Sequence, residues 1–213
     1  MQPDLYWISG SPPAWRVMLG FTLKGVSFTS RRLDHNAGEN RSSDYLALNP
    51  KGQVPTVVAG GLVIRESIAI LAWLDRAFPD RPIWGETAFD AAQNWQDIMV
   101  MEGDLRPHVT EAARSILRKN PIDQTTIDAL SHEMDSYDVR LSQNPNLGGS
   151  IPMASDIWLY PALHWIARGV ALSPDAPAAI ATLVSDRPFL NAWMDRFAAL
   201  QGVEDTYPTH WRD

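Results

Sequence analysis

The chain contains no cysteine among its 213 residues. It therefore has no disulfide framework, no thiolate metal site and no cysteine nucleophile, and any thiol chemistry requires a thiol that arrives with a ligand. Its five histidines show no spacing typical of metal ligands. We therefore expect neither a bound metal nor a redox cycle that uses a cysteine of the protein itself.

Long apolar runs and an excess of basic charge are also missing. No window approaches the ~20 apolar residues that cross a bilayer, and the N-terminus lacks a basic segment followed by an apolar run. The formal net charge of −7 argues against nucleic acid as a partner. We expect a cytoplasmic protein that binds neither membrane nor nucleic acid.

The first part of the chain, residues 1–80, alternates between strand and helix signals. The expected elements are strands at 5–9 and 26–30, a helix at 14–24, a short helix at 44–48, a hairpin at 55–64 and a helix that ends near Phe78. Strand, helix and strand in about thirty residues form a βαβ unit with parallel strands. The order βαβαββα is that of a thioredoxin-like domain.

The pattern is helical beyond a proline-containing linker at 79–82. The expected helices are a long one from about 91 to 117, one at 125–141, one that opens at Asp156 and one at 187–200. Pro107 should kink the long helix and not end it, because the apolar period resumes afterwards. An all-α second domain at 87–213 follows.

The hairpin carries the most informative residues. Pro55 opens a β-branched strand, although proline removes a donor from the sheet. A cis peptide before it would leave the backbone of Val54 free to pair with a ligand. Glu66 and Ser67 open the next helix, where backbone N–H groups lack partners and the dipole favours a carboxylate.

Val54-Pro55, followed by Glu66-Ser67 and an apolar helix, resembles the glutathione site of the soluble (cytosolic) glutathione transferases. In that family the residue before a cis proline pairs with the cysteinyl backbone of glutathione, and the acidic-Ser pair holds the γ-glutamyl end. The resemblance covers both halves of the chain. It implies a cytoplasmic homodimer whose thioredoxin-like domain binds glutathione and whose helical domain forms the electrophile side of the cleft.

The same resemblance assigns further binding residues. Val54, Pro55, Glu66 and Ser67 would hold glutathione, and Asn40, Gln53 and Lys51 are candidates for its glycine end. On the electrophile side we expect the loop that carries Ser11 and the long helix. The helix candidates are Trp95, Met99, Glu102 and Arg106.

Ser11 is the candidate catalytic residue. The segment from Ser11 to Val17 resembles the serine motif of the theta and zeta classes, whose hydroxyl donates to the glutathione sulfur and favours the thiolate. Ser11 is also a good helix N-cap, which is the structural alternative. Tyr6 and Ser9 are rivals, although Tyr6 lies inside the first expected strand.

The class and the reaction are open to alternatives. Pro12-Pro13 replaces the Ser-Cys that is usual in the zeta motif, whereas Arg168 stands twelve residues after Asp156, as in zeta enzymes. We expect transfer of a small apolar electrophile to glutathione, as in detoxification. The alternatives are cis–trans isomerisation of a maleyl-type diacid and a non-catalytic binding or regulatory role; peroxide reduction by the glutathione thiolate also remains open.

Asp156 resembles the buried aspartate of the capping motif in the second domain of the family. We therefore interpret it as structural. Met153 stands where that motif has serine or threonine, so we expect an incomplete reciprocal capping box with Ser155 as a substitute cap.

Overall fold

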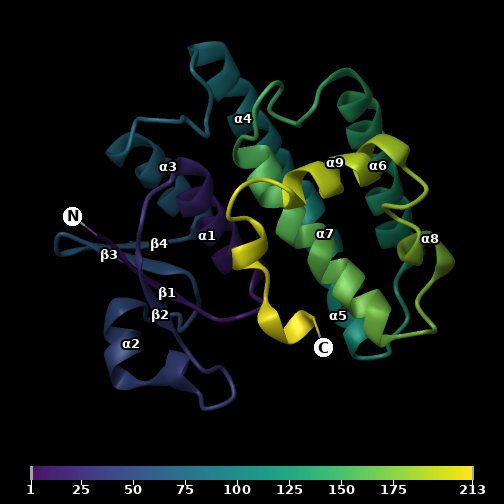
Figure 1. The fold of residues 1–213 in the computed structure, drawn as a ribbon. Coiled ribbons are helices and arrows are strands. Elements are labelled where there is room, and N and C mark those ends of the chain that lie inside the picture. Colours follow the sequence, from purple (N-terminus) through teal and green to yellow (C-terminus); the bar gives the residue numbers. More distant parts are fainter. Residues whose placement is uncertain (1, 213) are drawn as a thin grey trace. The chain divides into compact units, whose positions relative to one another are not determined.

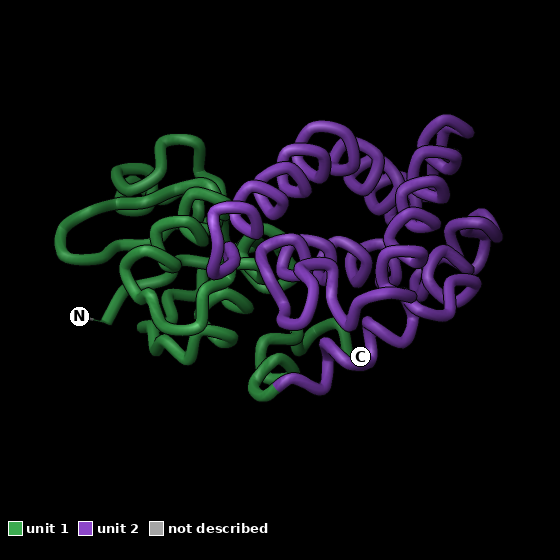
Figure 2. The backbone as a smooth tube through the Cα atoms, turned by 90° about the horizontal axis from the view of Figure 1, so that it is seen from above, with its two compact units in different colours: residues 1–83, 201–213 green, residues 84–200 purple. Residues whose placement is uncertain are grey.

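The computed structural model describes residues 2–212, which form two compact units (Figures 1 and 2). One unit holds the residues up to 83 together with those from 201 onward, and the other holds residues 84–200. The chain thus returns to its first unit after the helical one. This grouping differs from the sequence-based division into 1–80 and 87–213, because the last residues pack against helix α1 (Pro12–Lys24).

The first unit has the expected order βαβαββα, and the thioredoxin-like fold is confirmed. After α1 its elements are β1 (Asp4–Trp7), β2 (Thr29–Arg32), α2 (Ser43–Leu48), β3 (Thr56–Ala59), β4 (Leu62–Arg65) and α3 (Ser67–Ala77). Short 3-10 turns lie at Glu39–Arg41, Glu204–Thr206 and Thr209–Trp211. The second strand begins three residues later than the alternation at 26–30 predicted, so that boundary was wrong.

The sheet has the strand order β2-β1-β3-β4. The β1–β2 pair is parallel, as the βαβ unit predicted, whereas β3 runs antiparallel to both β1 and β4. The register pairs Trp7 with Arg32, and Tyr6 with Thr56. Thr56 also pairs with Arg65, so the end of β4 lies at the same sheet end as the end of β1.

Helices α1 and α3 share the core of the first unit with one face of the sheet. Its fully or nearly fully buried members are Leu5, Val17, Phe21, Val57, Ala59, Ile70 and Leu74. The two helices approach closely at Gly20, where a Cβ would lie 2.3 Å from a methyl carbon of Leu71. A larger residue at this position would therefore force the Leu71 side chain to shift.

The second unit consists of helices and their connecting loops. They are α4 (Ala88–Val100), α5 (Arg106–Leu117), α6 (Gln124–Gln143), α7 (Ala154–Leu172), α8 (Ala178–Ala181) and α9 (Pro188–Ala198). A π-helical turn, Met101–Leu105, joins α4 to α5 and keeps the chain helical up to Pro107. The wider turn accommodates the missing N–H of proline, in agreement with a kink instead of a break.

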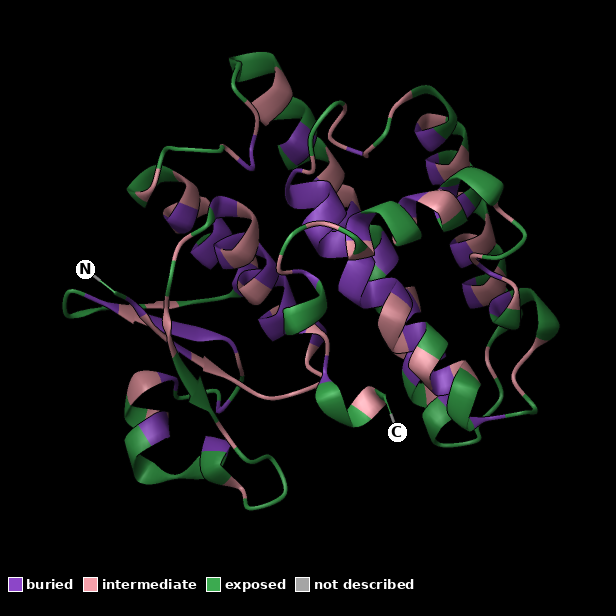
Figure 3. Ribbon diagram, viewed as in Figure 1, coloured by how far each residue is buried: buried purple, intermediate pink, exposed green. Residues whose placement is uncertain are grey.

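Helix α7 is the central element of this unit. Figure 3 shows it buried over its first half, and each residue from 154 to 163 has little contact with solvent. Its remaining turns alternate between buried and exposed positions. Among residues 2–212, no helix is both long and apolar enough to cross a membrane.

Candidate functional site

Three loops meet at one end of the four-stranded sheet. Tyr6 near the end of β1 pairs with Thr56 at the start of β3, and Thr56 pairs with Arg65 at the end of β4. The Ile8–Ser11 loop follows β1, Val54-Pro55 directly precede β3, and the turn into α3 follows β4. The strand register therefore gathers the three segments in which the sequence predicted binding and catalytic residues.

Buried polar side chains hold the loop before β3. The Gln53 carbonyl accepts from the Tyr45 hydroxyl at 2.6 Å and from the Asn49 amide at 2.7 Å. Tyr45 also contacts the Thr56 hydroxyl at 2.9 Å, and burial raises the pKa of Tyr45, so the group stays protonated and can donate. The Val54–Pro55 peptide that follows is cis. No other residue between 2 and 212 hydrogen-bonds to the Val54 backbone.

The three residues considered for the glycine end of glutathione occupy different environments. Asn40 is buried, and its amide nitrogen donates to the Gly52 carbonyl at 2.8 Å. It therefore holds the loop before β3 through this hydrogen bond to Gly52. The side chains of Gln53 and Lys51 are exposed instead, and a ligand can reach them.

Glu66 and Ser67 lie at the N-terminus of α3. Glu66 adopts a left-handed backbone conformation (φ 65°), and its exposed carboxylate pairs with Lys51 Nζ at 2.8 Å. Ser67 is the first helical residue and is buried. The first N–H groups of the helix have no intrahelical acceptor, so this turn presents donors, a hydroxyl and a carboxylate together. Such a set can bind both charges of an amino acid zwitterion.

Ser11 caps α1, but the bond is long. Its hydroxyl oxygen accepts from the Ala14 N–H at 3.5 Å. Pro12 and Pro13 occupy the first helical positions and have no N–H. Most helices offer several backbone N–H donors in their first turn. Because two prolines remove N–H groups here, the Ser11 hydroxyl is a principal donor at the start of α1.

The two rivals of Ser11 are placed differently. Tyr6 lies within β1, and its ring packs against Tyr45 at 5.7 Å between centroids. The Ser9 hydroxyl is hydrogen-bonded to His210 Nδ1 at 3.0 Å. Both side chains thus already have partners, whereas the Ser11 hydroxyl makes only its long capping bond to Ala14 within residues 2–212.

A cavity of about 180 Å³ lies beside the Ile8–Ser11 loop. Its walls come from residues 7–11, Trp15, Met18, Ser30, Arg32 and residues 205–209. A cavity of about 150 Å³ holds benzene. There is thus room for a small ring compound next to Ser11, between indole and phenol rings.

Three of the four electrophile-side candidates of the second unit, Trp95, Glu102 and Arg106, have partners within this unit. Trp95 stacks on Trp84 at 4.2 Å between ring centroids, and Met99 is exposed. Glu102 accepts from the Trp158 indole at 2.6 Å and pairs with Arg106 at 3.2 Å. Packing within this unit therefore accounts for Trp95 and Glu102.

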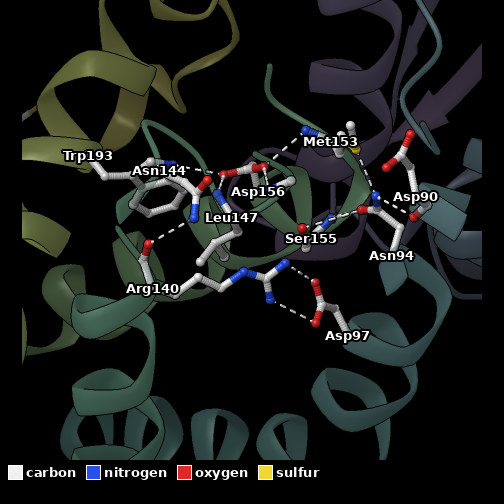
Figure 4. Close-up of polar contacts among 11 residues, drawn as sticks. Asp90, Asn94, Asp97, Arg140, Asn144, Leu147, Met153, Ser155, Asp156 and Trp193 are labelled. Atoms are coloured by element: carbon white, nitrogen blue, oxygen red, sulfur yellow. Dashed lines mark hydrogen bonds and ion pairs between the residues drawn. The ribbon is translucent and has the colours of Figure 1, made fainter. Parts of the chain in front are cut away.

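Asp156 organises the start of α7 (Figure 4). Its fully buried carboxylate accepts from the backbone of Leu147, Gly148 and Met153 and from the Trp193 indole, all at 2.8–3.0 Å. The structural interpretation agrees with these contacts. The Asp156 half of the capping box is present, because the Met153 N–H donates to the Asp156 carboxylate at 2.9 Å, whereas the Met153 sulfur accepts from the Asn94 amide at 2.7 Å. Ser155 contacts Asn94 instead of capping the helix.

Tyr160, His164 and Arg168 follow one another at intervals of four on α7 and so share one face. The Tyr160 and His164 rings lie 4.5 Å apart. Burial lowers the pKa of His164 to about 4, because the charged imidazolium would lose its hydration. Arg168, the residue behind the isomerase alternative, is partly buried and lies one helical turn after His164.

His164 should make stability depend on pH between its unfolded pKa of 6.5 and its folded pKa of about 4. Below 6.5 the unfolded chain takes up the proton first, so the free energy of unfolding falls by about 3 kcal/mol toward pH 4. Urea denaturation at several pH values measures this slope. His164→Gln should flatten it, whereas His132→Gln at an exposed position should not; equal slopes would contradict the prediction.

Sequence reasoning missed two groups of residues near the site. Tyr45 and Asn49 support the loop before β3, but a short polar helix gives no signal of this role. Residues 205–209 line the cavity although they were assigned to the helical domain. Among residues 2–212, no cluster of three or more His, Cys, Asp or Glu could hold a metal ion.

Comparison with known proteins adds an independent line of evidence. Residues 10–77 match the model of the glutathione S-transferase N-terminal domain. Glutathione S-transferase 1 of Dianthus caryophyllus is 36% identical over 49% of this chain and 47% of its own length. Glutathione S-transferase F10 of Arabidopsis thaliana is 28% identical over 86% of each chain. The crystal structure of a glutathione S-transferase from the Antarctic clam Laternula elliptica superposes with a TM-score of 0.84 at 26% identity, covering 100% of this chain and 95% of that one.

Proposed function

We propose that this chain, which belongs to the glutathione transferase family, binds glutathione at the sheet end of its first unit and directs the thiolate against a small apolar electrophile. The thiol proton leaves to solvent, the thiolate sulfur forms a bond to an electrophilic carbon, and the leaving group on that carbon departs as an anion with the electron pair of the bond that breaks. Because the chain has no cysteine, the reacting thiol belongs to glutathione.

The strand register is the observation that carries this proposal. It brings the backbone of Val54, the start of α3 and the Ser11 loop to one end of the sheet. The Val54 backbone pairs with the cysteinyl backbone of glutathione. Ser67 and the N–H groups of α3 receive the γ-glutamyl carboxylate, and Glu66 receives the ammonium. Gln53 and Lys51 face the glycine carboxylate.

Ser11 stabilises the thiolate by donating a hydrogen bond to the sulfur. Pro12 and Pro13 supply no N–H at this helix start, so the hydroxyl supplies the interaction that lowers the thiol pKa. A free thiol with a pKa of about 8.5 is mostly protonated at neutral pH. The neighbouring cavity admits the electrophile close to the activated sulfur.

The quaternary state and cellular role follow the family resemblance. We propose a cytoplasmic homodimer that detoxifies electrophiles. Exposed apolar side chains of the helical unit support an interface: Phe89 and Met99 on α4 are 69% and 57% exposed. Sedimentation velocity measures the dimer directly, and a monomer at micromolar concentration would exclude it.

Calorimetric titration of glutathione tests the binding site. The wild type should bind, and Ser67→Ala should raise the dissociation constant about tenfold, because one charge-assisted hydrogen bond to the carboxylate is lost. Ser136→Ala replaces an exposed serine on α6 and should bind glutathione like the wild type.

The proposal fails if the wild type shows no binding at millimolar glutathione. The chain would then be a transferase fold retained for interaction with other molecules. If Ser67→Ala binds glutathione as tightly as the wild type, the γ-glutamyl end does not bind at the start of α3.

A further inference from the structure

The last residues of the chain pack on the start of α1. The Trp15 indole donates to Thr206 Oγ1 at 2.7 Å, and this hydroxyl donates to the Val203 carbonyl at 2.7 Å. The Trp15 ring also meets Tyr207 and Trp211 edge-on, at 5.4 and 5.8 Å between centroids. Residues 203–211, here called the C-terminal clamp, are thus anchored on a buried tryptophan.

The clamp also reaches the loop that carries Ser11. His210 Nδ1 is hydrogen-bonded to the Ser9 hydroxyl at 3.0 Å. A Cβ built on Gly10 would lie 3.0 Å from Trp211 Nε1 and 3.1 Å from the His210 ring. Gly10 has a φ of 80°, so glycine suits both its conformation and the close approach of the clamp.

We infer that the C-terminal clamp positions the Ile8–Ser11 loop so that Ser11 meets the glutathione sulfur, with His210 as the positioning residue. This inference rests on the proposed function. His210 touches neither substrate nor sulfur in this arrangement, and it acts through Ser9 and Gly10.

The other backbone hydrogen bonds of the loop lie at its Ser11 end, where the Ser11 carbonyl accepts from the Trp15 N–H at 2.9 Å. Its own backbone contributes a bond from Ser11 N to the Ile8 carbonyl at 3.2 Å. Pro12 and Pro13 restrict the backbone where the loop enters α1. Ser9 and Gly10, in the middle of the loop, have no proline beside them to restrict their backbone. A hydrogen bond to the sulfur requires the hydroxyl within about 0.5 Å of its productive position. The clamp supplies this restraint from the other end of the chain.

His210→Ala tests the inference through the thiol of bound glutathione, followed by the ultraviolet absorbance of the thiolate. Loss of one neutral hydrogen bond should raise the bound thiol pKa by about 0.7 units, equal to about fivefold in ionisation. The kcat with an aryl chloride activated by nitro groups should fall by a similar factor, while the KM for glutathione stays within about twofold.

Two substitutions separate positioning from general stability. His210→Asn places an amide where Nδ1 stood and should restore most of the wild-type thiol pKa. His35→Ala removes an exposed histidine from another loop and should leave pKa and kcat unchanged. If His210→Ala titrates like the wild type, or if the asparagine variant does not recover, His210 has no positioning role.

Thr206→Val tests the clamp at its anchor. This near-isosteric change removes the hydrogen bond between the Trp15 indole and Thr206 and should raise the thiol pKa, as His210→Ala does. If the wild type lowers the thiol pKa of bound glutathione and both variants lower it equally, the inference is overturned and the proposed function stands. A wild type that binds glutathione without lowering its thiol pKa would refute the proposed thiolate activation instead.

Discussion

Replacing Ser11 by alanine should lower the rate of glutathione transfer at about pH 6 by tenfold to a hundredfold. If Ser11 lowers the thiol pKa by about two units, its loss reduces the thiolate population at low pH by about a hundredfold. The thiolate of the wild type is less basic and therefore a weaker nucleophile, which offsets about tenfold of the advantage that its larger thiolate population gives. The pH–rate profile should therefore move to higher pH, and the loss should shrink as the pH rises.

Ser11→Thr is the matched control, because threonine retains both the hydroxyl and the ability to cap α1. It should keep the wild-type pH–rate profile. Since removal of an N-cap costs about 1 kcal/mol, the free energy of unfolding of Ser11→Ala is measured alongside its kinetics. If the pH–rate profile of Ser11→Ala coincides with that of the wild type, Ser11 acts only as the helix cap of α1.

Replacing Asp156 by alanine should lower the free energy of unfolding by about 3–5 kcal/mol. The change removes an acceptor shared by three backbone N–H groups and the Trp193 indole (Figure 4). Burial raises the pKa of Asp156, so removal of the charge recovers part of its desolvation cost. Three buried donors and the partly buried Gly148 N–H lose this acceptor, which costs more than the recovery, so the net effect is destabilising.

Asp138→Ala provides the comparison for this measurement. Its carboxylate also accepts two backbone N–H groups, those of Phe189 and Leu190 at the start of α9, but it is partly solvated. Water can replace it there, and we expect a cost of about 1 kcal/mol. Chemical denaturation measures the free energy of unfolding of both variants. Equal losses of this free energy would show that the burial of Asp156 does not add to its stabilising effect.

Much of the first unit could be predicted from its sequence. Alternating apolar residues and the break at Gly60-Gly61 specify the hairpin, and Glu66-Ser67 mark the start of α3. The second strand was displaced because Val26 and Phe28 pack on the core beside it without forming its ladder. Apolar alternation alone cannot distinguish these two situations.

Two side chains have partners that the sequence did not indicate. Asn40 is a ligand candidate, and its buried amide nitrogen donates to the Gly52 carbonyl. Met153 stands at the start of α7, and its sulfur accepts from the Asn94 amide. Neither outcome follows from residue type, because a polar or sulfur atom takes whichever partner the packing places beside it.

The sequence by itself determined the order of the elements, the turn into α3 and the absence of any protein thiol, because periodicity, capping and composition act over neighbouring residues. Only the tertiary structure decided which distant residues meet. Ser9 and His210 are 201 positions apart, and Trp15 and Thr206 are 191 apart. No local pattern encodes such pairs, since they form only when the chain returns from its helical unit and closes on the start of α1.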